Sequence, residues 1–131
     1  MSIKWLCAYE IVKKYDIIST MKGLIIKQPW IDYILSGNKI WEIRGTNTNI
    51  RGKIKLIQSG SGLVVGSCEI VDSKELTLDS YRQYKHFHKI ENVSTLPYKR
   101  TFAWIIKNAQ RYESPRKYKH PNGAIIWVNL D

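Results

Sequence analysis

Three ionisable residues stand close together in the segment QPWIDYILSGNKIWEIRG, which covers residues 28–45. Lys39, Glu42 and Arg44 occupy three of six consecutive positions among large apolar side chains. A carboxylate between two cations holds both in place, so the group offers donors to a phosphate or a base carbonyl and one acceptor to an amine. The alternative is a solvated ion-pair ladder, which contributes only about 0–1 kcal/mol.

Strand periodicity decides which way these side chains point. Alternate residues of a strand share one face, so Glu42 and Arg44 point together. Trp41 and Ile43 point the other way and are expected to enter the core. We therefore expect Glu42 and Arg44 to line the opposite surface, with Lys39 at the mouth of a cleft.

The preceding residues predict a strand, a short helix and a second strand. The apolar run 22–27 predicts a buried strand, which ends before Pro29 because proline drives its predecessor away from helical geometry. Residues 30–35 have apolar side chains at helical spacing. Gly37 suits the end of that helix, and 39–44 alternates as a strand.

Three further residues each have two readings. Gln28 either directs its amide into the cleft or caps the helix. Trp30 belongs either to the core or to the cleft wall. Lys107 follows an apolar run and either reaches the cleft or marks a solvated strand end.

The remaining chain reads as mixed but rich in strands. We expect a helix that begins near Asp79 or Ser80, a basic loop or irregular hairpin over 108–122, and a bulge or close approach at Gly66. Further strands are predicted at 53–58, 63–71, 102–106 and 123–130. The pattern indicates an α+β protein: a small β-barrel of about six strands with flanking short helices. Residues 1–20 are interpreted as an accessory segment, possibly helical, and 21–131 as the domain.

The charge balance favours a polyanionic partner. Lys and Arg number 21 against 11 Asp and Glu, a formal net charge of +10. Between residues 97 and 120, Glu113 is the single acidic residue among basic and aromatic side chains. Basic groups bind phosphates and aromatic faces stack on bases, which indicates nucleic acid rather than a merely solvated face. The basic residues are Lys99, Arg100, Lys107, Arg111, Arg116, Lys117 and Lys119, and the aromatic ones are Tyr98, Phe102, Trp104, Tyr112 and Tyr118.

Several classes of protein are disfavoured. The sequence has no apolar run of about 18 residues, so we expect no membrane span and a cytoplasmic location. Cys7 and Cys68 lack partners at metal-ligand spacing and are expected to be reduced thiols. His86 and His88 have no third ligand beside them, so we expect neither a metal nor a cofactor.

The run GLIIKQPWIDYILSGNKIWEIR resembles the opening of the ASCH domain, which has a QPW-like turn, a short helix and then G-x-K-x-x-E-x-R. GLVVGSCEIVD resembles the central strand of that domain, and FAWIIKNAQRYESP with GAIIWVNL resembles its closing pair. The resemblance covers residues 22–130. It implies a PUA-like β-barrel with a cleft beside the first helix.

The resemblance also implies a ligand class. ASCH domains bind RNA or other nucleic acids, including modified bases; a bacterial branch hydrolyses N4-acetylcytidine with a Lys–Thr–Glu set, and some members cut RNA. On that pattern Lys39 matches the catalytic lysine and Glu91 is the candidate carboxylate. Glu42 stands where the family has threonine, so that nucleophile is missing.

The sequence thus leads to three hypotheses. The first is a module that binds RNA or single-stranded nucleic acid and takes a base or nucleotide into a cleft lined by Lys39, Glu42 and Arg44. The second is an enzyme, a hydrolase of a modified nucleoside or a ribonuclease, which uses Lys39, Glu42 and Glu91. The third is a domain whose basic face meets an acidic protein. The sequence does not indicate the oligomeric state.

Overall fold

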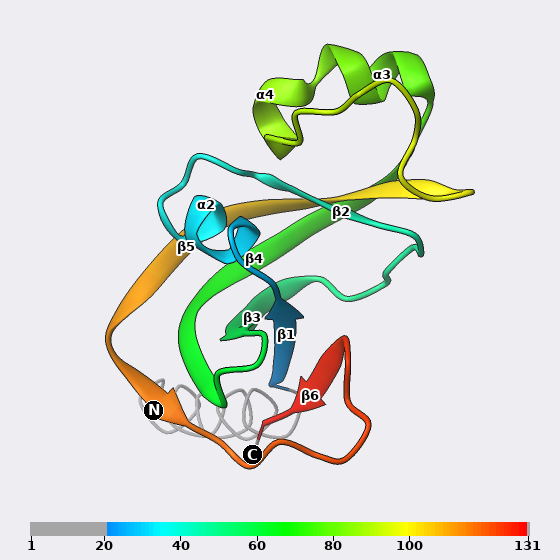
Figure 1. Cartoon of the computed structure of the whole chain (residues 1–131). Coiled ribbons are helices and arrows are strands. Elements are labelled where there is room, and N and C mark those ends of the chain that lie inside the picture. The colour runs from blue at the N-terminus through cyan, green and yellow to red at the C-terminus, as the bar shows by residue number, and fades with distance from the viewer. Residues whose placement is uncertain (1–20, 131) are drawn as a thin grey trace, which may run out of the picture.

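The computed structural model describes residues 21–130, which form a six-stranded mixed sheet and three short helices (Figure 1). The predicted accessory segment 1–20 and its boundary with the domain lie outside the described residues. In chain order the elements are β1 (Lys22–Ile26), α2 (Trp30–Leu35), β2 (Trp41–Arg44), β3 (Gly52–Gln58), β4 (Leu63–Leu76), α3 (Leu78–Gln83), α4 (Lys85–His88), β5 (Thr101–Lys117) and β6 (Trp127–Asn129).

The sheet has the strand order β2-β5-β4-β3-β1-β6. Strands β1 and β3 pair in parallel, and all other neighbouring pairs are antiparallel. The long strands β4 and β5 bend strongly, and α3 and α4 lie at one end of them (Figure 1). The α+β class is therefore confirmed.

The expected closure into a barrel is not confirmed, because β2 and β6 are the edge strands of the described sheet and do not pair with each other. Side chains span the two ends instead. The Arg44 side chain of β2 donates to the Ile25 carbonyl of β1 at 3.0 Å. Trp104 of β5 stacks on Trp127 of β6 with ring centroids 5.7 Å apart. The sheet is thus curled and bridged by side chains, but it is not a continuous barrel.

Most expected elements are present with shifted ends. Helix α3 was expected to begin near Asp79 or Ser80. It begins earlier, after the cap residue Thr77, whose hydroxyl accepts from the Ser80 amide. The predicted loop at 108–122 is wrong for its first ten residues, because β5 continues to Lys117 as the partner of β4. The last strand is shorter than the predicted 123–130.

Two apolar clusters set the position of β2. The main one fills the curl of the sheet under α2 and includes Leu24, Ile34 and Trp104. The second joins β2 to the α3–α4 segment through Trp41 and Tyr81. Strand β2 is consequently covered on both sides, which buries charged residues that a surface strand would expose.

Gly66 confirms the expected close approach of two segments. A Cβ atom there would lie 2.3 Å from the Gln110 carbonyl oxygen and 2.5 Å from Leu35 Cδ2. The β4–β5 register also shifts beside Gly66. The missing side chain lets β5 and helix α2 pack onto β4.

Further observations concern membrane-spanning helices, metal sites and the cysteines. Among the described residues, no helix is long and apolar enough to cross a membrane, and no group of three or more His, Cys, Asp or Glu is placed to hold a metal. Cys68 is a buried free thiol, and burial raises its pKa to about 12. Cys7 lies outside the described residues.

Candidate functional site

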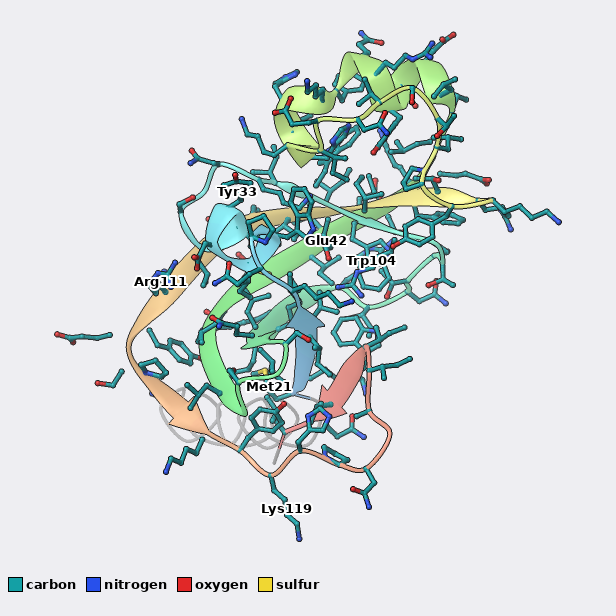
Figure 2. The ribbon with its side chains drawn as sticks, in the orientation of Figure 1. Met21, Tyr33, Glu42, Trp104, Arg111 and Lys119 are labelled. Atoms are coloured by element: carbon teal, nitrogen blue, oxygen red, sulfur yellow. The ribbon has the colours of Figure 1, made fainter. Side chains whose placement is uncertain are left out.

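Strand β2 places Glu42 and Arg44 on one face and Trp41 and Ile43 on the other. The expectation that Trp41 and Ile43 enter the core is confirmed. The opposite face is not an open surface, because Glu42 is only 5% exposed. Glu42 pairs with Trp104 of β5 in the ladder, near the middle of the molecule (Figure 2).

The sequence predicted Lys39 at the mouth of the site, but the structure places it at the floor. It is 1% exposed. Its Nζ donates to the His88 carbonyl at 2.6 Å and lies 3.8 Å from Glu42 Oε1. The Trp30 ring centroid is 4.9 Å from the same Nζ. Burial is the main cause that lowers the Lys39 pKa to about 8; Glu42 opposes the shift and Arg44 adds to it.

Arg44 is held rigidly by several partners. Its Nε and Nη2 lie 2.9 and 2.8 Å from Glu42 Oε2, and Nη2 also donates to the Ile25 carbonyl. The guanidinium lies 5.4 Å from the Trp104 ring centroid, and Trp104 Nε1 in turn donates to the Thr46 carbonyl. A cation with so many fixed partners presents its remaining donors in a set direction.

A cavity of about 330 Å³ opens beside these three residues. That volume is at the lower end of the range of small-molecule sites in proteins. Charged groups form one part of the wall, and apolar side chains from two distant loops form another. The lining residues are Ile25, Lys27, Trp30, Lys39, Glu42, Ile43, Arg44, Ser59, Ile90, Pro97, Tyr98 and Ile125.

The other residues predicted for the cleft lie in different places. Trp30 contacts the main core and also lines the cleft, so both of its readings apply. Gln28 directs its amide to Gln58 at 3.4 Å and neither lines the cleft nor caps α2. Glu91 has a side chain 90% exposed, pairs with Lys85 at 2.9 Å and is not part of the cleft wall.

The predicted basic residues are exposed along β5 and just beyond it, and none lines the cleft. Arg111 pairs with Asp32 of α2 at 3.0 Å. Arg116 lies 4.9 Å from the Tyr112 ring centroid. Figure 2 shows Arg111 and Lys119 at the periphery, away from Glu42. These outer residues are Lys107, Arg111, Arg116, Lys117 and Lys119.

The aromatic residues of the same segment have separate roles. Phe102 and Trp104 are buried in the core. The Tyr112 hydroxyl accepts from Lys55, and the Tyr118 hydroxyl bonds to His120. Tyr98 is the one of the five that lines the cleft.

Two apolar loop residues that line the cleft were not predicted from the sequence. Ile90 and Ile125 gave no signal as cleft residues, because isolated apolar residues in loops are common. His88, which was considered only as a metal ligand, contributes its carbonyl to Lys39. Its Nδ1 accepts from the Ile90 amide, so its Nε2 donates to the Tyr81 carbonyl.

Comparison with known families bears on the resemblance seen in the first segment. The model of the ASCH domain matches residues 24–116, which is most of the chain and includes Lys39, Glu42 and Arg44. The chain belongs to the ASCH domain family. Among proteins with curated functions, none matches it.

Solved structures of ASCH proteins have the same fold. Crystal structures of two single-residue variants of an ASCH protein from Zymomonas mobilis align with TM-scores of 0.63 and 0.65, each at 12% identity. They cover 86% and 85% of this chain, and 89% and 90% of the matched chain. A further structure of ASCH from the same organism aligns at 0.59 over 71% of each chain, also at 12% identity.

Proposed function

We propose that this ASCH domain binds RNA or single-stranded nucleic acid and takes one base or nucleotide into the cleft beside β2. The observation that carries the proposal is the fixed group of Lys39, Glu42 and Arg44 in the wall of a cavity of about 330 Å³. Two cations and one anion leave that wall with an excess of positive charge, which favours electron-rich groups of a nucleotide.

The cluster supports recognition of a base edge. Within residues 21–130, Arg44 binds its partners through Nε and Nη2, which leaves Nη1 available to donate to a ligand. Glu42 Oε1 lies 3.8 Å from Lys39 Nζ, beyond a hydrogen bond, and has capacity to accept. A donor beside an acceptor complements the edge of an unpaired base, the form in which proteins read RNA sequence.

The exposed cations of β5 supply a second, less specific contribution. Phosphate contacts release counterions, so affinity should fall steeply as salt increases. Lys117 at the end of β5 and Lys119 just after it are exposed outside the cleft and are suited to bind the phosphate backbone. They would add affinity for all sequences and little discrimination among bases.

A salt titration tests this function. A labelled single-stranded RNA is titrated with the protein between 50 and ~200 mM salt, with affinity expected to fall by an order of magnitude or more. Changing both Lys117 and Lys119 to Glu should weaken binding and reduce the salt slope. The single change Lys117→Glu is compared with Lys74→Glu, a control with the same change of charge at an exposed residue of β4. Affinity that is indifferent to salt would contradict the proposal.

A second function is favoured by one specific observation, the lowered pKa of Lys39. A base is most effective when its pKa is near the working pH, and burial brings that of Lys39 to about 8. Glu42 Oε1 at 3.8 Å is the carboxylate nearest in the site, whereas the predicted Glu91 is outside the cleft. The candidate reaction is hydrolysis of a modified nucleoside, such as N4-acetylcytidine, or cleavage of RNA.

This enzymatic function is tested separately from binding. The protein is incubated with N4-acetylcytidine and with RNA, beside a Lys39→Ala control, and products are separated by chromatography. Turnover by the wild type that is lost in Lys39→Ala would support an enzyme. Intact substrates in both incubations, with binding retained, would leave the binding module alone.

A further inference from the structure

Two exposed apolar side chains stand at the cleft. Tyr98 is 47% exposed and Ile125 is 78% exposed, and both line the cavity. They come from different loops, one before β5 and one before β6. Exposed apolar groups that gather beside polar residues mark ligand-binding grooves more often than singly scattered ones do.

Contacts of both its ring and its backbone fix the position of Tyr98. A Cβ atom at Gly45 would lie 2.9 Å from Tyr98 Cδ1 and 3.1 Å from Cγ, so the ring rests directly on the Gly45 backbone. The buried Thr101 hydroxyl donates to the Tyr98 carbonyl at 3.0 Å and accepts from its amide at 3.3 Å. Gly45 follows Arg44 directly, which places the ring next to the polar cluster.

Ile125 is exposed on a loop that is also held. His120 Nε2 donates to the Ala124 carbonyl at 2.9 Å, so its Nδ1 accepts from the Tyr118 hydroxyl at 2.6 Å. On the other side, the Ile126 carbonyl accepts from the Ile25 amide of β1 at 2.9 Å. Both neighbours of Ile125 are therefore tied down, and its exposure reflects a set position and not a loose segment.

We propose that Tyr98 and Ile125 hold the planar ring of one nucleobase, while Arg44 and Glu42 bind its edge. The inference rests on the proposed nucleic-acid function and names the base, not the phosphate, as the group that the cleft selects. A phosphate is satisfied by cations alone and gains nothing from the two apolar walls. A base has two apolar faces and a polar edge, which matches the two kinds of surface present here.

Gly45 has a matching role as a positioning residue. Its φ angle lies outside the left-handed region, so the backbone there accepts alanine. The conflict of an alanine methyl group is with the Tyr98 ring, which would be displaced. Gly45→Ala thus moves the proposed stacking surface without altering any charge.

The experiment measures affinities of the full chain for two probes of equal length. One is a fluorescein-labelled single-stranded RNA of mixed sequence, and the other is the same backbone with abasic sites. Tyr98→Ala should weaken RNA binding by roughly 10- to 100-fold, the range for loss of a base-stacking aromatic residue. Gly45→Ala should reproduce the direction of that effect, and Tyr98→Phe should keep the wild-type affinity. Binding of the abasic probe should not change.

Tyr33→Ala serves as the matched control, because Tyr33 is 40% exposed and does not line the cleft. Thermal unfolding of each variant reports whether it is folded. If Tyr98→Ala binds RNA as the wild type does, or loses the same factor for the abasic probe, the stacking proposal is overturned while the nucleic-acid function stands. If the wild type binds neither probe, the proposed function fails and the stacking proposal fails with it.

Discussion

Replacing Lys39 with methionine should make the protein more stable. The Lys39 pKa of about 8, against 10.5 for an ordinary lysine, means that burying the charged amine costs about 3 kcal/mol at neutral pH. Methionine has a similar length and no charge. The change also leaves the His88 carbonyl without its donor, a loss of about 1 kcal/mol, whereas Glu42 keeps its two contacts with Arg44. The expected net gain is about 1–2 kcal/mol of unfolding free energy.

The pH dependence identifies the cause. Between pH 8 and 10.5 the unfolded chain carries more protons on Lys39 than the folded protein does, so the stability of the wild type should rise with pH through that window. The raised pKa values of Tyr81 and Tyr118 act in the opposite direction at high pH. The difference between wild type and Lys39→Met removes these shared contributions.

Urea unfolding followed by tryptophan fluorescence at several values of pH from 7 to 10.5 measures that difference. The advantage of Lys39→Met at pH 7 should shrink as pH rises and then reverse or vanish. Lys74→Met, a change at an exposed lysine, should show no such trend. A variant that is less stable than wild type by about 3 kcal/mol at every pH would refute the reasoning, because it would show that Lys39 is a stabilising ion-pair partner.

Three further outcomes follow from other parts of the structure. Gly66→Ala should cost several kcal/mol in urea unfolding, since its methyl group would collide with the Gln110 carbonyl; a change below ~0.5 kcal/mol would show that β5 yields easily. Burial lowers the His88 pKa, and a second ring proton, on Nδ1, would face the Ile90 amide. The free energy of unfolding should therefore fall as pH drops below 6.5, and His88→Gln should reduce that loss. The same dependence of stability on pH in His88→Gln and the wild type would contradict this prediction. Arg44→Lys should weaken RNA binding by about 10-fold or more while the protein stays folded, because one ammonium cannot hold Glu42 through two donors and also present a donor to the base; equal affinities would count against Arg44 as a base contact.

Local patterns were sufficient for the polar cluster. The alternation of residues 39–44 places Glu42 and Arg44 on one face and Trp41 in the core, which the structure confirms. The strands at 22–27 and 53–58 were also predicted within a residue or two. In each case the period of the apolar residues and the nearby glycine or proline carried the information.

Burial of the cluster was not predictable from the same pattern. Lys39 is covered because the His88 carbonyl, 49 positions along the chain, meets its amine. That contact depends on how the α3–α4 segment folds over β2, and the residues near Lys39 in the sequence do not indicate it. Tyr98 and Ile125 likewise reach the cleft through loops, whose paths follow from tertiary packing and not from local propensity.

The error at 108–122 has a related cause. Charged and polar residues from Lys107 onward indicated a loop, yet they form a strand because β4 offers a long partner with free backbone groups. The polar composition reflects exposure of the strand, since most of residues 107–117 are exposed. Backbone pairing outweighed the low apolar content.

A crystal structure of the chain with a short single-stranded RNA would test the account. We expect one base in the cleft, its face against Tyr98 and its edge within hydrogen-bond distance of Arg44 and Glu42. RNA bound only along the outer face of β5, with the cleft empty, would contradict it.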